Sequence, residues 1–122
     1  MSSNEELEKK YSICVDYMMD IVKKTTKQMK KDKITEVVID LDIKQCEPFM
    51  TSTSVEKIGE INKFEYKTIY KNNMIIKLDP FQYVSNSFSK YKLSSYTGTL
   101  DYEKVYFKHP DAKKLVIKKK EK

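Results

Sequence analysis

The chain has 122 residues and a formal net charge of +6, carried by 24 lysines and no arginine. A chain of this length forms one domain of ordinary size, which buries enough surface to fold without a disulfide or a metal. Two glycines exclude a glycine-rich phosphate loop, and no stretch approaches the roughly 20 apolar residues of a membrane span. We therefore predict a single domain over residues 1–122 with no membrane partner.

The first predicted element is a long amphipathic helix at the N-terminus. Apolar or small side chains recur at three- and four-residue intervals at Leu7, Tyr11, Cys14, Met18, Val22, Thr25 and Met29. This spacing places them on one face of a helix of about seven turns. We expect this helix stripe to pack on the core. The alternative is that it also docks a partner, because methionine adapts to varied surfaces.

The apolar period changes from 3.6 to 2 after the helix. Alternating apolar residues from Val37 to Ile43 predict a strand with one buried face. Residues 46–55 contain Pro48 and a run of serine and threonine, which indicates a loop. Residues 80–98 carry a weaker signal, from which we expect one or two short strands.

Residues 63–78 predict a hairpin, because apolar and polar side chains alternate on both sides of two asparagines. A three-residue turn at 71–73 would pair Tyr66 with Leu78 and gather the apolar side chains on one face. A two-residue Asn-Asn turn would instead place Lys67 opposite Leu78. We favour the three-residue turn, because a one-residue slip moves the side chains of a strand to the other face.

A second hairpin is predicted over residues 100–119, with its turn at 109–112. The expected pairs are Tyr106 with Leu115, Val105 with Val116 and Glu103 with Lys118. A helix followed by such a meander buries its stripe across one face of the sheet. The predicted fold class is therefore α+β, with one long N-terminal amphipathic helix packed on a curved antiparallel sheet of about four to six strands.

Few residues in the sequence suggest a catalytic or metal-binding role. Asp40 and Asp42 share one face of the predicted strand, where with Glu36 they could hold Mg²⁺ and serve an enzyme. Alternating acids are also typical of a solvated strand face, which is the interpretation we favour. Cys14 and Cys46 are too few for a disulfide framework, so we expect reduced thiols in a cytoplasmic or nuclear protein. We predict no catalytic residue, metal site, cofactor or small-molecule substrate.

The positive charge is concentrated at one end of the chain. From Glu103 to Lys122, eight lysines face three acids, a net +5, whereas residues 1–102 carry sixteen lysines and fifteen acids, a net +1. The missing arginine, together with abundant Lys, Ile, Asn and Tyr, indicates an AT-rich genome. Because lysine lacks the planar fork of arginine, any nucleic-acid contact would be electrostatic, salt-sensitive and weakly specific.

The charge distribution predicts a non-enzymatic small basic binding module, a subunit of a larger assembly that contacts RNA or DNA through its C-terminal hairpin and tail. The residues predicted to make this contact are Tyr102, Lys104, Tyr106, Lys108, Lys113, Lys114, Lys118, Lys119 and Lys120. The alternative is a protein–protein interaction or scaffold subunit without nucleic-acid contact. Such a subunit would use the helix stripe or a sheet edge, whose unpaired backbone groups a partner strand can complete.

Overall fold

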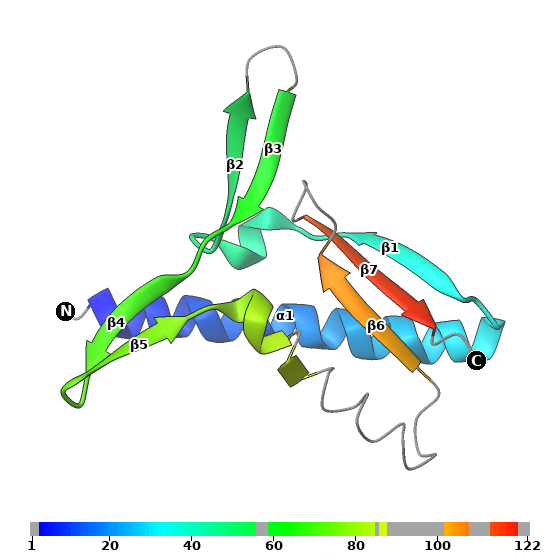
Figure 1. Cartoon of the computed structure of the whole chain (residues 1–122), viewed down its shortest axis with the longest axis horizontal. Helices are drawn as coiled ribbons and strands as arrows, with labels where there is room; N and C mark the ends of the chain where they lie inside the picture. Colours follow the sequence, from blue (N-terminus) through cyan, green and yellow to red (C-terminus); the bar gives the residue numbers. More distant parts are fainter. Residues whose placement is uncertain (1–2, 56–58, 85, 88–101, 108–112, 120–122) are drawn as a thin grey trace.

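A computed structural model describes residues 3–55, 59–84, 86–87, 102–107 and 113–119 (Figure 1). The elements with defined bounds are, in chain order, α1 (Ser3–Asp32), β1 (Glu36–Asp40), the 3₁₀ helix η1 (Ile43–Cys46), β2 (Met50–Val55), β3 (Gly59–Phe64), β4 (Lys67–Lys71), β5 (Met74–Leu78), β6 (Tyr102–Phe107) and β7 (Lys114–Lys119). The predicted α+β class with a long N-terminal helix is confirmed.

Helix α1 has 30 residues, with acidic side chains in its first turn and lysines in its last turn, where each sign of charge is favoured by the helix dipole. Its predicted apolar face is buried: Cys14, Met18 and Val22 have no exposed surface, and Met29 is nearly as buried. The helix stripe is therefore occupied by the protein's own core. None of the helices in the described part of the chain combines the length and apolar character needed to cross a membrane.

The described strands form three antiparallel sheets, one of three strands in the order β1-β7-β6 and two hairpins, β2-β3 and β4-β5. The single curved sheet that we expected is not confirmed. Figure 1 shows β4-β5 beside the N-terminal half of α1, β1-β7-β6 beside its C-terminal half, and β2-β3 extending away from the helix. Small sheets of this kind depend on packing for stability, because an isolated hairpin is at best marginally stable in water.

One hydrophobic cluster joins α1 to the strands. Its buried members are Cys14, Met18, Val22, Met29, Leu41, Cys46, Phe49, Met50, Ile69, Leu78, Phe81, Val84, Leu115 and Ile117. Phe49 has no exposed surface, and its ring meets that of Tyr11 edge-on at 6.1 Å between centroids. The ring centroids of Phe81 and Phe64 are 4.6 Å apart. Aromatic pairs of this kind add to the stabilisation that burial gives.

The predicted loop over residues 46–55 is wrong in its second half, which forms β2. Its Ser and Thr residues pair with β3, from Met50 opposite Phe64 to Val55 opposite Gly59. Backbone pairing accommodates this polar run, because threonine fits the pleated backbone well. The predicted continuous strand over 63–70 is interrupted, since β3 ends at Phe64 and β4 begins at Lys67 in another sheet.

The strands expected after Pro80 are not present at 80–84 and 86–87, which are helical. Asp79 starts this helix: its Oδ1 accepts a hydrogen bond from the Gln82 N–H at 3.0 Å, as an N-cap carboxylate does. Pro80 occupies the first helical position, where its missing N–H costs nothing. The remainder of the predicted region, residues 88–98, lies outside the described residues.

The second hairpin is present as β6-β7, but its predicted register is wrong by one residue. Tyr106 pairs with Val116, and Lys118 pairs with Lys104 instead of Glu103, at an irregularity in β6. Strand β7 is central, so its side chains must also fit β1, which places Ile39 opposite buried Leu115. The alternation of apolar and polar side chains along β6 and β7 does not reveal that β7 must also fit β1. The predicted turn at 109–112 lies outside the described residues.

Candidate functional site

The predicted basic surface centres on β7, which β1 flanks on one side. In the β1-β7 ladder, Glu36 lies opposite Lys118 and Asp40 lies opposite Lys114. The Lys114 Nζ approaches Asp40 Oδ1 to 2.5 Å. Opposite charges in directly opposed positions stabilise a sheet modestly. Two of the predicted contact lysines therefore face acids, which reduces the positive field that they offer to an anionic partner.

The other predicted contact residues lie along the same hairpin. Lys104 is opposite Lys118 and Tyr102 is opposite Lys119, while Lys113 uses its carbonyl to accept the Leu41 N–H at 2.9 Å. The structure thus brings the backbones of Tyr102, Lys104, Lys118 and Lys119 together on one hairpin. Tyr106, which pairs with Val116, lies on the same hairpin. Lys108 and Lys120 lie outside the described residues.

The Asp40–Lys114 pair has a measurable titration signature. The hydrogen bond from Lys114 has the largest effect on the Asp40 carboxyl and lowers its pKa. Desolvation opposes this effect by raising the pKa, and the nearby charges of Lys114 and Lys113 lower it further. A lowered folded-state pKa contributes stability above the unfolded pKa, and that stability is lost as pH falls through the folded value. Because Asp40 is exposed, solvent screening keeps this contribution small.

We expect Lys114→Gln to raise the pKa of Asp40 toward its ordinary value, because the hydrogen bond to an ammonium is lost. A carboxyl-carbon NMR titration measures this directly. Lys118→Gln is the matched control, since Lys118 lies opposite Glu36 and should leave Asp40 almost unchanged. Identical Asp40 titrations in wild type and Lys114→Gln would contradict the ion pair.

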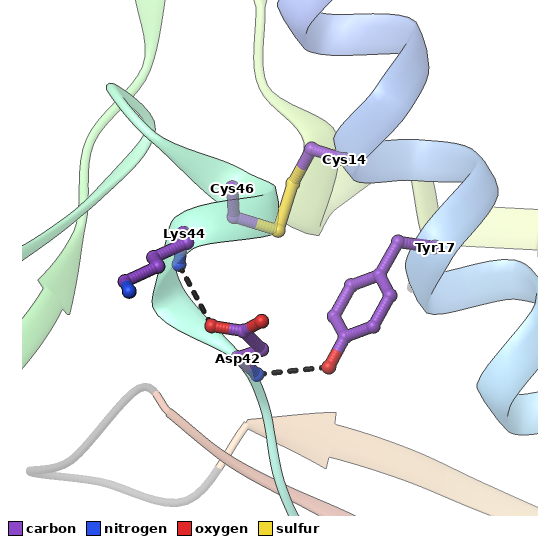
Figure 2. Close-up of a disulfide and its surroundings, with 5 residues drawn as sticks. All are labelled: Cys14, Tyr17, Asp42, Lys44 and Cys46. Atoms are coloured by element: carbon purple, nitrogen blue, oxygen red, sulfur yellow. Dashed lines mark hydrogen bonds between the residues drawn. A yellow bond between two sulfur atoms is a disulfide. The ribbon is translucent and has the colours of Figure 1, made fainter.

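Asp40 and Asp42 do not form the paired carboxylates of the metal hypothesis. Strand β1 ends at Asp40, and Asp42 instead caps η1, its Oδ1 accepting the Lys44 N–H at 3.1 Å. The Asp42 N–H donates to the Tyr17 hydroxyl at 2.8 Å, which ties η1 to α1 (Figure 2). Among the described residues, no cluster of three or more His, Cys, Asp or Glu side chains could hold a metal ion.

The two cysteines form a disulfide between α1 and η1, so the prediction of free thiols is wrong (Figure 2). Cys14 and Cys46 are both fully buried, and their Cα atoms are 4.6 Å apart. Their separation of 32 residues gave no sign of this proximity, which arises when η1 packs on the helix. Disulfides persist mainly in oxidising compartments, so the argument from thiols for a cytoplasmic or nuclear protein no longer holds.

The β4-β5 hairpin differs most from its predicted form. Lys71 pairs with Met74, so the turn contains only Asn72 and Asn73, and Lys67 lies opposite Leu78. Both asparagines have positive φ, 54° and 61°. This is the backbone of a type I′ turn, whose twist matches that of the strands and which asparagine tolerates well. Turn chemistry therefore overrides the apolar pattern from which we predicted a three-residue turn.

The shorter turn leaves large apolar side chains in solvent. We call these residues the hairpin patch: Tyr66, Tyr70, Met74 and Ile75, whose exposed fractions are 56%, 63%, 60% and 76%. Their neighbours Ile69 and Leu78 are buried in the core on the inner face. Single exposed apolar residues are normal, whereas several on one hairpin make this surface a candidate functional site.

Polar contacts hold this hairpin to α1. The Asn4 side-chain amide donates to the Tyr70 carbonyl at 2.8 Å, and Lys71 Nζ lies 3.0 Å from Glu8 Oε1. On the other strand, Lys77 Nζ lies 4.2 Å from the centroid of the Tyr66 ring. The patch is therefore presented on a hairpin that is fixed to the helix.

Comparison with known protein families, with characterised proteins and with solved structures finds no match to this chain. The function must therefore be inferred from the geometry of its own surfaces. The basic hairpin was visible in the sequence as a run of lysines. The hairpin patch was hidden, and the signal that could have revealed it is the Asn-Asn pair, a typical two-residue turn.

Proposed function

We propose that the protein is a non-enzymatic protein-interaction subunit that uses the β5 edge and the hairpin patch. The observation that carries this proposal is the exposure of Tyr70 and Ile75 beside a strand edge. An open edge offers backbone donors and acceptors to an added strand, and adjacent apolar side chains strengthen such pairing.

The ladder determines which backbone groups face outward. In a hairpin with a two-residue turn, the pair beside the turn exchanges its hydrogen bonds, and such pairs alternate with non-hydrogen-bonded ones. The non-hydrogen-bonded pairs here are Tyr70 with Ile75 and Thr68 with Lys77. Their N–H and C=O groups point away from the partner strand, which agrees with the hydrogen bond that Tyr70 accepts from Asn4.

The two edges of the hairpin are not equivalent. The β4 edge faces α1, because the side-chain amide of Asn4 on the helix donates to the Tyr70 carbonyl at this edge. The β5 edge has no neighbouring strand among the strands that the structure describes, and Ile75 and Lys77 direct their outward backbone groups to that side. A partner strand would therefore add at β5.

A second candidate function is electrostatic contact of RNA or DNA by the C-terminal hairpin and tail. Its support is the net +5 of residues 103–122. The position of Lys114 and Lys118 opposite two acids weakens that support, since these acids neutralise part of the charge. The exposed patch therefore favours protein interaction as the main proposal.

Affinity capture from native extract separates the two candidates, if it is done with nuclease and at high salt. We expect protein bound by wild type to survive both treatments and to be lost with Ile75→Lys. The matched control Ile13→Lys adds the same charge at another exposed isoleucine, on α1, and should retain it. Material lost on nuclease or salt treatment but unaffected by Ile75→Lys would contradict the proposal and support nucleic-acid contact.

A further inference from the structure

We propose that the strand added at β5 belongs to a second copy of this chain. This inference rests on the proposed function and names the partner of the same edge. Two β5 strands would pair antiparallel about a two-fold axis at Ile76, giving a four-stranded sheet in the order β4-β5-β5-β4. Such an isologous contact uses one surface patch on both copies, as most homodimers do.

The backbone selects this register. Ile75 and Lys77 carry the outward groups of β5, two residues apart. Centring the pair on Ile76 places Ile75 of each copy opposite Lys77 of the other, so both residues on each copy can exchange N–H···O bonds. The outward N–H and C=O groups of Ile75 and Lys77 are then all hydrogen-bonded to the corresponding groups of the second copy.

Neighbouring registers are worse. Centring the pair on Lys77 would set this lysine directly against itself, and like charges in opposed positions are destabilising. Centring it on Ile75 would pair Lys77 with Asn73, which has positive φ and lies in the turn, outside the strand. The charge pattern and the turn therefore leave one self-complementary register.

Side chains support the same arrangement. Ile75 is 76% exposed in the monomer and would lie against the aliphatic stem of Lys77 of the second copy. An edge lysine often opposes strand addition. Here the Lys77 ammonium is directed to its own chain, over the Tyr66 ring and 3.7 Å from Asp79 Oδ2. Its charge is thus partly compensated before a second strand arrives.

Sedimentation velocity over a concentration series of the purified full chain tests this inference. We expect wild type to dimerise and Ile75→Lys to raise the dissociation constant on the order of tenfold or more, because two lysines would then face each other at each Ile75–Lys77 pair. The control Ile13→Lys should dimerise like wild type. Circular dichroism and urea unfolding at low concentration verify that both variants fold, as expected for exposed sites.

Two results would overturn the second-copy inference: wild type that remains monomeric throughout the series, or Ile75→Lys that dimerises as tightly as Ile13→Lys. These failures are distinct from failure of the proposed function. A monomeric wild type that still captures a different protein in an Ile75-dependent manner would retain the interaction surface and exclude only the second copy. A monomer whose capture is indifferent to Ile75 would exclude both.

Discussion

Reduction of the Cys14–Cys46 disulfide should lower the free energy of unfolding by about 3–4 kcal/mol, the loop-entropy value for the 32-residue separation of the two cysteines. The bond restricts the unfolded chain, and in the folded protein it joins α1 to η1 inside the core. A domain of this size has a total stability of about 5–15 kcal/mol, so the loss would be a large fraction of it.

Urea unfolding of the oxidised and reduced chain measures this effect. Alkylation in denaturant should label neither cysteine before reduction and both afterwards. A Cys14→Ala, Cys46→Ala variant provides the control, because its midpoint should be low and insensitive to the reductant. Equal midpoints for oxidised and reduced wild type would show that the bond has no structural role.

Phe49→Ala should destabilise the fold by about 3–5 kcal/mol, the usual cost of removing a buried phenylalanine ring. Phe49 is fully buried and contacts the ring of Tyr11 from α1. Its backbone also links neighbouring segments, since its N–H donates to the Cys46 carbonyl at 2.7 Å and its carbonyl accepts the Glu65 N–H at 2.6 Å. The cavity would therefore open where η1, β2 and the helix meet.

Tyr70→Ala is the control for this substitution, because it removes a ring of similar size that is 63% exposed. We expect a change of less than about 1 kcal/mol when unfolding is measured at low protein concentration. Thermal or urea unfolding gives both values. Similar losses for Phe49→Ala and Tyr70→Ala would contradict the position of the core.

Helix α1 was predictable because its signal is local and long. Side chains from Leu7 to Met29 repeat with the helical period over many turns, and the structure buries most of that face. Strand β1 was also predicted from a local pattern, the alternation of apolar side chains. The strand ends at Asp40, however, and after it Leu41 enters the core and Asp42 caps η1.

The disulfide, the β6-β7 register and the three-sheet arrangement could not be predicted, because each depends on contacts between distant segments. Cys14 meets Cys46 only after η1 packs on α1, and the register of β7 is set jointly by β1 and β6. Alternation along one strand contains no information about such partners.

The prediction of the hairpin turn was wrong for a more informative reason. The apolar pattern favoured a three-residue turn, whereas Asn72 and Asn73 form a two-residue turn that leaves Tyr70 and Ile75 exposed. When local turn chemistry and apolar burial disagree in a native chain, the exposed residues are expected at a functional surface. The same conflict that made the prediction wrong therefore identifies the surface for which we propose a partner.

Residue-resolved amide hydrogen exchange at low and high protein concentration tests the β5 edge most directly. If a second copy pairs with β5, the Ile75 and Lys77 amides should exchange fast at low concentration and become protected at high concentration. The Ile76 amide, already bonded toward Ile69 of β4, should be protected at both. Fast exchange of Ile75 and Lys77 at every concentration would contradict strand addition by a second copy.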